Sequence, residues 1–145
     1  MQKPIYDYIK SIGIATLLLV MLSACAKKIN FPSSAMVPAA NGYVKIKSTD
    51  NNYTIEVRLE NLAPAKNLSP PRETYVVWAE TKDQGIKKLG VMNSSSGMFS
   101  STLKSSLSAT LAVKPTKIFV TAEDRHDVQF PGMPVVLQTE SFKVR

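Results

Sequence analysis

Apolar and polar residues alternate without interruption from Tyr53 to Glu60, and this pattern restricts the possible folds more than any other feature. The odd positions hold the apolar residues Tyr53, Ile55, Val57 and Leu59, and the even positions are polar or charged. Successive side chains of a β-strand point to opposite faces, so a period of two places the apolar set on one side. The segment is therefore predicted to be a strand with one face in a core and the other in solvent.

Six further segments are typical of strands, and residues that favour turns separate them at intervals of about ten residues. Between 99 and 113 the leucines also fit a helical stripe, but the serine and threonine content favours a strand. About seven short strands without a convincing amphipathic helix predict an all-β fold, an antiparallel immunoglobulin-like β-sandwich. The further segments are Tyr43–Ser48, Thr74–Glu80, Lys88–Met92, Phe99–Val113, Lys117–Glu123 and Pro134–Val144.

The segment Tyr75–Ala79 is apolar at every position and contains Trp78, the only tryptophan of the chain. A strand that is apolar on both faces is expected in the centre of a fold, so Trp78 is predicted to be a core residue. The alternative is an exposed aromatic platform for a ligand. Immunoglobulin-like sandwiches have a buried tryptophan on their third strand, but the disulfide that accompanies it in antibody domains requires two cysteines, and this chain has one.

The N-terminal segment has the parts of a secretory signal. Lys3 and Lys10 precede an apolar run over 12–22, which is too short to span about 30 Å of hydrocarbon. The run ends in Leu22-Ser23-Ala24-Cys25, which resembles a bacterial lipobox. The resemblance implies a signal peptide over 1–24, cleavage between Ala24 and Cys25, and lipidation of Cys25. The alternatives are an ordinary signal peptide with Cys25 as an incidental first residue, and an uncleaved membrane helix.

Removal of the signal leaves about 120 residues, which is enough for one domain. Residues 25–41 are rich in Pro, Ser, Ala and Asn, include Pro32 and Pro38, and show no sustained period. We therefore expect a lipidated N-terminus and flexible tether over 25–41 and a β-sandwich domain over 42–145. Ala26 follows the expected lipidated cysteine, where an aspartate is absent, and this resembles the arrangement that permits transport to the outer membrane. In a double-membrane bacterium the resemblance implies an outer-membrane location facing the periplasm rather than the inner membrane.

The chain is basic, with a formal net charge of +7. In a lipid-anchored, exported protein this charge indicates anionic lipid or another anionic envelope polymer as a partner, and not nucleic acid. The alternative is a soluble surface with a surplus of lysines, because the lysines are spread along the chain. Lys27 and Lys28 adjoin the expected anchor, where each cation would add about 1 kcal/mol to the attachment. An envelope protein is the other expected partner.

The residues that carry enzyme chemistry are scarce. His126 is the only histidine and lies in Arg125-His126-Asp127, within a predicted loop, so an exposed turn is expected there. No serine lies in a nucleophile elbow, no residues have metal-ligand spacing, and no Gly-rich phosphate loop follows a strand. The sequence therefore predicts a protein that is not an enzyme and has no catalytic residue, cofactor or metal. Catalysis would require a concave cluster of polar residues around His126.

A series of motifs lies between residues 73 and 140. They are Tyr75-Val76-Val77-Trp78, Lys88-Leu89-Gly90-Val91-Met92, Phe99, Phe119-Val120-Thr121-Ala122-Glu123 and Pro131-Gly132-Met133-Pro134-Val135-Val136-Leu137. In this order and at this spacing they resemble the extracytoplasmic domain of anti-sigma-K-type factors. The resemblance implies a similar β fold. About ten residues precede the apolar run, which is too few for the cytoplasmic sigma-binding segment of those factors, so we expect the outer domain alone. We expect a non-enzymatic, lipid-anchored envelope protein with a binding or structural module; the alternative is an accessory sensor or regulator of an envelope signalling partner.

Overall fold

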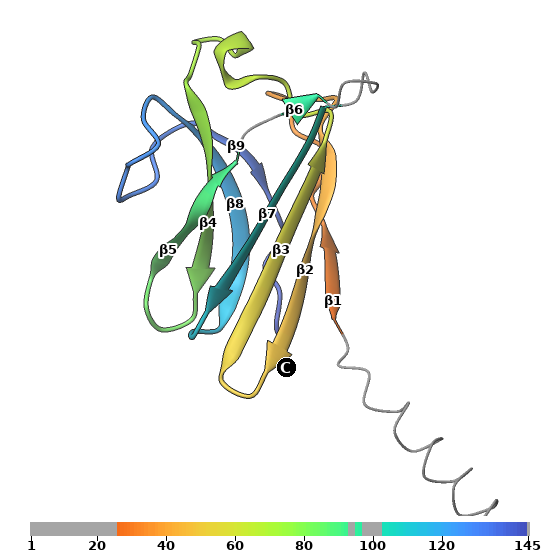
Figure 1. The fold of residues 1–145 in the computed structure, drawn as a ribbon, viewed down its shortest axis with the longest axis vertical. Coiled ribbons are helices and arrows are strands. Elements are labelled where there is room, and N and C mark those ends of the chain that lie inside the picture. Colours follow the sequence, from red (N-terminus) through yellow and green to blue (C-terminus); the bar gives the residue numbers. More distant parts are fainter. Residues whose placement is uncertain (1–25, 93–94, 97–102, 145) are drawn as a thin grey trace, which may run out of the picture.

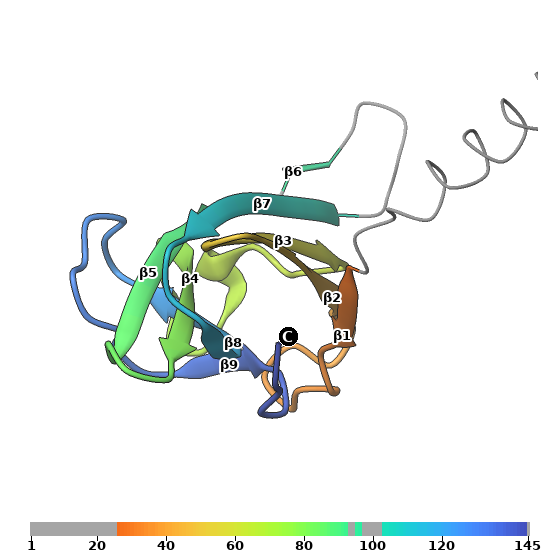
Figure 2. The ribbon, with the colours of Figure 1, turned by 90° about the horizontal axis from the view of Figure 1, so that it is seen from below.

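The computed structural model describes residues 26–92, 95–96 and 103–144, and two antiparallel sheets account for most of them (Figure 1). The first sheet has the order β1 (Lys27–Asn30), β2 (Asn41–Thr49), β3 (Asn52–Glu60), β7 (Leu103–Leu111) and β6 (Ser95–Ser96). The second has the order β5 (Ile86–Met92), β4 (Thr74–Thr81), β8 (Pro115–Glu123) and β9 (Val135–Gln138). The two sheets face each other in Figure 2, which confirms the predicted all-β sandwich.

The strand order is that of an immunoglobulin-like sandwich. In that fold one sheet carries strands A, B, E and D and the other carries C, F and G, with C′ beside C in variable domains. The order β2, β3, β7 and β6 corresponds to A, B, E and D. The order β5, β4, β8 and β9 corresponds to C′, C, F and G. Strand β1 is an additional edge strand. The predicted count of about seven therefore lacks two short strands, β1 and β6, whose sequences show no strand pattern of their own.

The main core lies between the inner faces of the two sheets. In β3 the predicted alternation is confirmed, because Ile55, Val57 and Leu59 are buried while Thr54 and Arg58 are exposed. The antiparallel register sets Val57 beside Val44 and Ile55 beside Ile46 of β2. The second sheet contributes the buried residues Tyr75, Val77, Ala79, Ile118, Val120 and Ala122 to the same core.

The predicted tether over 25–41 is wrong for the described part of that segment. Strand β1 pairs with β2, and Phe31, Val37 and Ala40 are buried in the main core. The Phe31 amide donates to the Gly42 carbonyl at 3.0 Å. Burial of an apolar side chain such as Phe31 or Val37 stabilises the fold by about 1.5–3 kcal/mol. This gain offsets the conformational entropy that is lost when a segment with weak local preferences becomes ordered. The folded domain therefore includes β1 and the segment after it, and the predicted start at residue 42 is too late.

The last predicted strand, Pro134–Val144, is shorter in the structure. Strand β9 ends at Gln138, and the chain continues alongside β8, where the Thr139 amide donates to the Ile118 carbonyl at 2.9 Å. Phe142 and Val144 are still buried in the main core. The segment between 103 and 111 is a strand, as its Ser and Thr content predicted, and residues 99–102 of the predicted Phe99–Val113 strand lie outside the described residues.

Candidate functional site

The outer face of the second sheet carries a separate buried cluster. Val76, Trp78 and Phe119 form it, and Val128 and Val135 pack against it. Trp78 is only 1% exposed, so its predicted burial is confirmed and it cannot act as an exposed aromatic platform. Trp78 does not lie between the sheets, however. Its side chain is on the outer face of β4, a strand that is apolar on both faces. The loop over 124–134, which joins β8 to β9, covers this outer cluster.

A chain of hydrogen bonds runs from the outer cluster into the loop. The Trp78 Nε1–H donates to Thr121 Oγ1 at 2.8 Å, and the Thr121 hydroxyl donates to Glu123 Oε1 at 2.5 Å. The Gly132 amide donates to the same Glu123 oxygen at 2.8 Å. Glu123 is only 6% exposed, and hydrogen bonds to a buried carboxylate are stronger than neutral ones. This series of hydrogen bonds therefore holds the C-terminal half of the loop against the sheet.

Lys88 holds the loop at its middle. Its Nζ donates to the His126 carbonyl at 2.7 Å and to the Val128 carbonyl at 3.1 Å. One side chain of β5 therefore binds two backbone groups of a loop about 40 residues away along the chain.

Arg72, which precedes β4, binds both ends of the loop, and Arg125 forms an ion pair within the loop. Arg72 donates to Asp124 Oδ2 at 2.6 Å and to the Met133 carbonyl at 3.3 Å. Arg125 donates twice to Asp127, at 2.9 and 2.5 Å, and this hydrogen bonding lowers the pKa of the Asp127 carboxyl. The loop is thus attached to the sheet at both ends and in the middle.

Despite this attachment, the loop presents two large apolar side chains to solvent. Phe130 is 83% exposed and Met133 is 75% exposed, the highest values among the large apolar side chains of the described residues. Aromatic residues and methionine are enriched at protein–protein interfaces. An ordered loop that exposes both has the composition of a contact surface, and we call the segment 128–135 the apolar tip.

The cleft beside this loop contains the polar cluster that catalysis at His126 would require. It has a volume of about 630 Å³ and is lined by Glu73, Thr74, Val91 and residues 124–127. Thr74 Oγ1 is buried without a hydrogen-bond partner among the described residues. Asp124 and Asp127 are engaged by arginines, however, and the His126 contact described above uses its carbonyl and not its ring. The cleft therefore gathers polar side chains around His126, but no hydrogen bond joins the His126 ring to a carboxylate of its lining.

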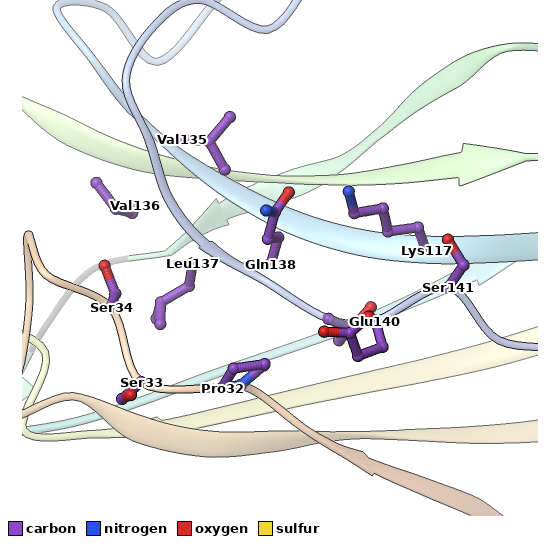
Figure 3. A pocket seen from close by; sticks show the side chains of 11 residues that line it. Pro32, Ser33, Ser34, Lys117, Val135, Val136, Leu137, Gln138, Glu140 and Ser141 are labelled. Carbon is purple, nitrogen blue, oxygen red and sulfur yellow. The ribbon is translucent and has the colours of Figure 1, made fainter.

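A second cleft follows the outer edge of β9. It has a volume of about 330 Å³ and lies between this strand and the segment 32–34 (Figure 3). Lys117 and Glu140 are the charged residues of its lining, and Val136, Leu137 and Gln138 come from β9 itself. The cleft exists because the segment after β1 crosses to the second sheet. The sequence did not predict this cleft, because it assigned that segment to a flexible tether.

The predicted site residues Ala24 and Cys25 lie outside the described residues, so cleavage and lipidation stay predictions. Among the described residues, no three His, Cys, Asp and Glu side chains are grouped so that they could hold a metal ion. In the same part of the chain, no helix is both long and apolar enough to cross a bilayer. Sequence reasoning missed Lys88 and Glu123 as anchors of the loop, and only the position of Glu123 at the end of a buried strand indicated an unusual role.

Comparisons of the chain with protein-family models, with curated proteins and with solved structures gave no match. The strand order and the attached loop define the class of the protein. It is an immunoglobulin-like sandwich in which the loop over 124–134 covers the outer face of the second sheet.

Proposed function

We propose that this protein is a lipid-anchored, non-enzymatic component of the cell envelope that binds a partner protein through the apolar tip. The observation that carries the proposal is the exposure of Phe130 and Met133 on an attached loop. Burial of a Phe or Met side chain in a partner would contribute about 1.5–3 kcal/mol. Because the loop is already ordered by Lys88 and Glu123, binding would incur little additional loss of conformational entropy.

The charge of the apolar tip supports a protein partner over an anionic surface. Residues 128–135 contain no charged side chain. Lipid or polymer binding by charge would require cations there, whereas a neutral pocket in a protein matches this segment.

The position of the tip relative to the expected anchor supports the same choice. Cys25 precedes Lys27 by two residues, which span at most about 7 Å. Strand β1 begins at the lower end of the sandwich in Figure 1, and the loop between β8 and β9 lies at the upper end. A lipid on Cys25 would therefore hold the lower end at the bilayer and direct the apolar tip away from it.

Substitution of Phe130 tests the binding role. Phe130→Ser should change the free energy of unfolding by no more than about 0.5 kcal/mol, because the side chain is exposed. In a strain that lacks the native gene, the variant should fail to restore the wild-type phenotype, and a photo-crosslinker at position 130 should form a protein adduct. Ile86, which is 48% exposed on β5, is the matched control: Ile86→Ser should restore the phenotype, and a crosslinker there should give no such adduct.

Full rescue by Phe130→Ser would contradict the proposal. His126→Ala separates binding from catalysis, because its side chain is exposed and the Lys88 bond uses its carbonyl. We expect this variant to fold and to restore the phenotype. Normal folding with complete loss of rescue would instead favour an enzymatic or ligand-binding role for the cleft around His126.

The anchor is tested at Cys25. Cys25→Ala should abolish incorporation of labelled fatty acid and leave the unprocessed precursor, because the only thiol that could accept the lipid is lost. Fractionation of wild-type cells then checks the expected outer-membrane location. Labelling of the Cys25→Ala chain would contradict the lipid anchor, and recovery of the wild type only in inner-membrane fractions would contradict the location.

A further inference from the structure

Three lysines lie together on the outer face of the first sheet. The burial pattern of β2 alternates, with Val44 and Ile46 in the core and Lys45 and Lys47 exposed. The register sets Lys28 of β1 directly opposite Lys45. We call Lys28, Lys45 and Lys47, together with Tyr43 on the same face, the basic strip.

The arrangement of these cations is unfavourable for the isolated domain. Like charges directly opposite each other on neighbouring strands destabilise a sheet. The Lys28 and Lys45 Nζ atoms lie 4.2 and 5.6 Å from the centroid of the Tyr43 ring, and this contact offsets only part of the repulsion. A bound anion would remove the repulsion that remains.

No acidic side chain of the described residues neutralises the basic strip. Glu56 of β3 lies opposite Lys45 in the register, but its carboxylate is bound by Arg58, whose Nε donates to Glu56 Oε1 at 2.6 Å. No ion pair of the described residues includes Lys28, Lys45 or Lys47. The strip therefore presents three cations that are open to an external anion.

We infer that the basic strip binds the headgroups of anionic phospholipids in the bilayer that holds the protein. This inference rests on the proposed lipid anchor and deepens it, because it names the lipid class that the domain contacts. Lys28 follows Cys25 by three residues, so at most about 11 Å of chain separates it from the expected lipid. At physiological salt, charges interact over about 8 Å, so headgroups would lie within or close to the reach of the strip.

The orientation that results is compatible with the proposed partner. Strands β1 and β2 form one edge of the first sheet, and the loop over 124–134 lies on the far side of the molecule in Figure 2. Contact of the basic strip with a bilayer therefore leaves the apolar tip accessible.

Sedimentation with lipid vesicles tests the inference on the chain from 26 to 145. This chain contains every residue of both buried clusters, and it carries no acyl group, so binding reports the strip alone. We expect it to bind vesicles of one part phosphatidylglycerol to two parts phosphatidylcholine, and not vesicles of phosphatidylcholine. Each cation at an anionic surface raises the partition coefficient about fivefold, so Lys28→Gln, Lys45→Gln and Lys47→Gln together should lower it about 100-fold.

The matched control changes the net charge equally at other places. Lys66, Lys82 and Lys87 lie in η1 (Ala65–Asn67), in the turn after β4 and in β5, and their joint replacement by Gln should lower the partition coefficient less than fivefold. Melting curves of both variants establish that they fold. The inference is overturned if wild type does not bind the anionic vesicles, if it binds an anionic polymer but no vesicle, or if both triple variants lose binding equally. These outcomes do not depend on the Cys25→Ala result, so this failure is distinguishable from failure of the anchor.

Discussion

At the scale of single residues, Tyr75 shows how the core accommodates a polar atom. The side chain is 2% exposed, and its hydroxyl donates to the Ala63 carbonyl at 2.7 Å. Burial disfavours the phenolate and raises the pKa of Tyr75 to about 12. The ring fills space between the sheets while its one polar group is satisfied by the backbone, so the residue stabilises the fold in its neutral form only.

This pKa predicts a loss of stability in alkaline solution. Tyrosine in the unfolded chain ionises near pH 10, so the stabilisation due to neutral Tyr75 is fully present below pH 10 and is lost as the pH rises towards about 12. Urea unfolding between about pH 8 and 12 should show this fall. Tyr75→Phe should be less stable by about 1 kcal/mol at neutral pH but should show a shallower alkaline loss. Equal pH profiles for the two proteins would contradict the interpretation.

At the scale of elements, the loop over 124–134 depends on contacts with residues outside it. Its own residues include Pro131 and Gly132, which favour turns, and they do not define its place on the sheet. Lys88, Glu123 and Arg72 supply the hydrogen bonds that do. The buried outer cluster under the loop is therefore coupled to the exposed apolar tip through a few polar contacts.

Removal of the Lys88 ammonium should loosen this loop. Lys88→Met keeps a similar apolar stem but loses both hydrogen bonds to the loop, at a cost of about 1–2 kcal/mol. Hydrogen exchange should become faster for amides over 124–134 and stay unchanged in β2 and β3. Lys87→Met, the neighbouring substitution, is the control and should leave the exchange rates of the loop as in wild type. If both variants exchange alike, Lys88 does not hold the loop.

At the scale of the whole molecule, the chain must stabilise its sandwich without a disulfide, because Cys25 is its only cysteine. The segment over 27–40 contributes to this stability by joining the two sheets. Lys27 Nζ donates to the Lys143 carbonyl at 2.7 Å, and Phe31 and Val37 enter the main core. Both ends of the described chain therefore meet at one side of the sandwich.

A chain that begins at Gly42 should not fold stably. The loss of Phe31 and Val37 alone is expected to remove about 3–8 kcal/mol, which is comparable with the total stability of a domain of this size. Circular dichroism and urea unfolding should show a cooperative transition for the chain from 26 to 145 and none for the truncated chain. Phe31→Ala in the longer chain should give an intermediate stability. A cooperative transition of wild-type stability in the truncated chain would restore the predicted tether.

The sequence alone identified the strands of the two sheets other than β1 and β6, and it predicted the burial of Trp78. The alternation of Tyr53–Glu60 and the apolar run Tyr75–Ala79 are local properties, and the period of side chains along a strand converts them directly into buried and exposed faces. The candidate site was only partly predictable. His126 was expected in an exposed turn, which the structure bears out, but the cleft beside it was not expected.

Only the tertiary structure decided which residues meet across the fold. The second face of β4 packs under the β8–β9 loop, Lys28 stands opposite Lys45, and the first 15 described residues belong to the sandwich and not to a tether. Each of these features joins segments that are separated along the chain. Their free energy comes from apolar burial and from hydrogen bonds between partners distant along the chain, as for Lys27 and Lys143, and a local pattern does not contain the identity of such partners.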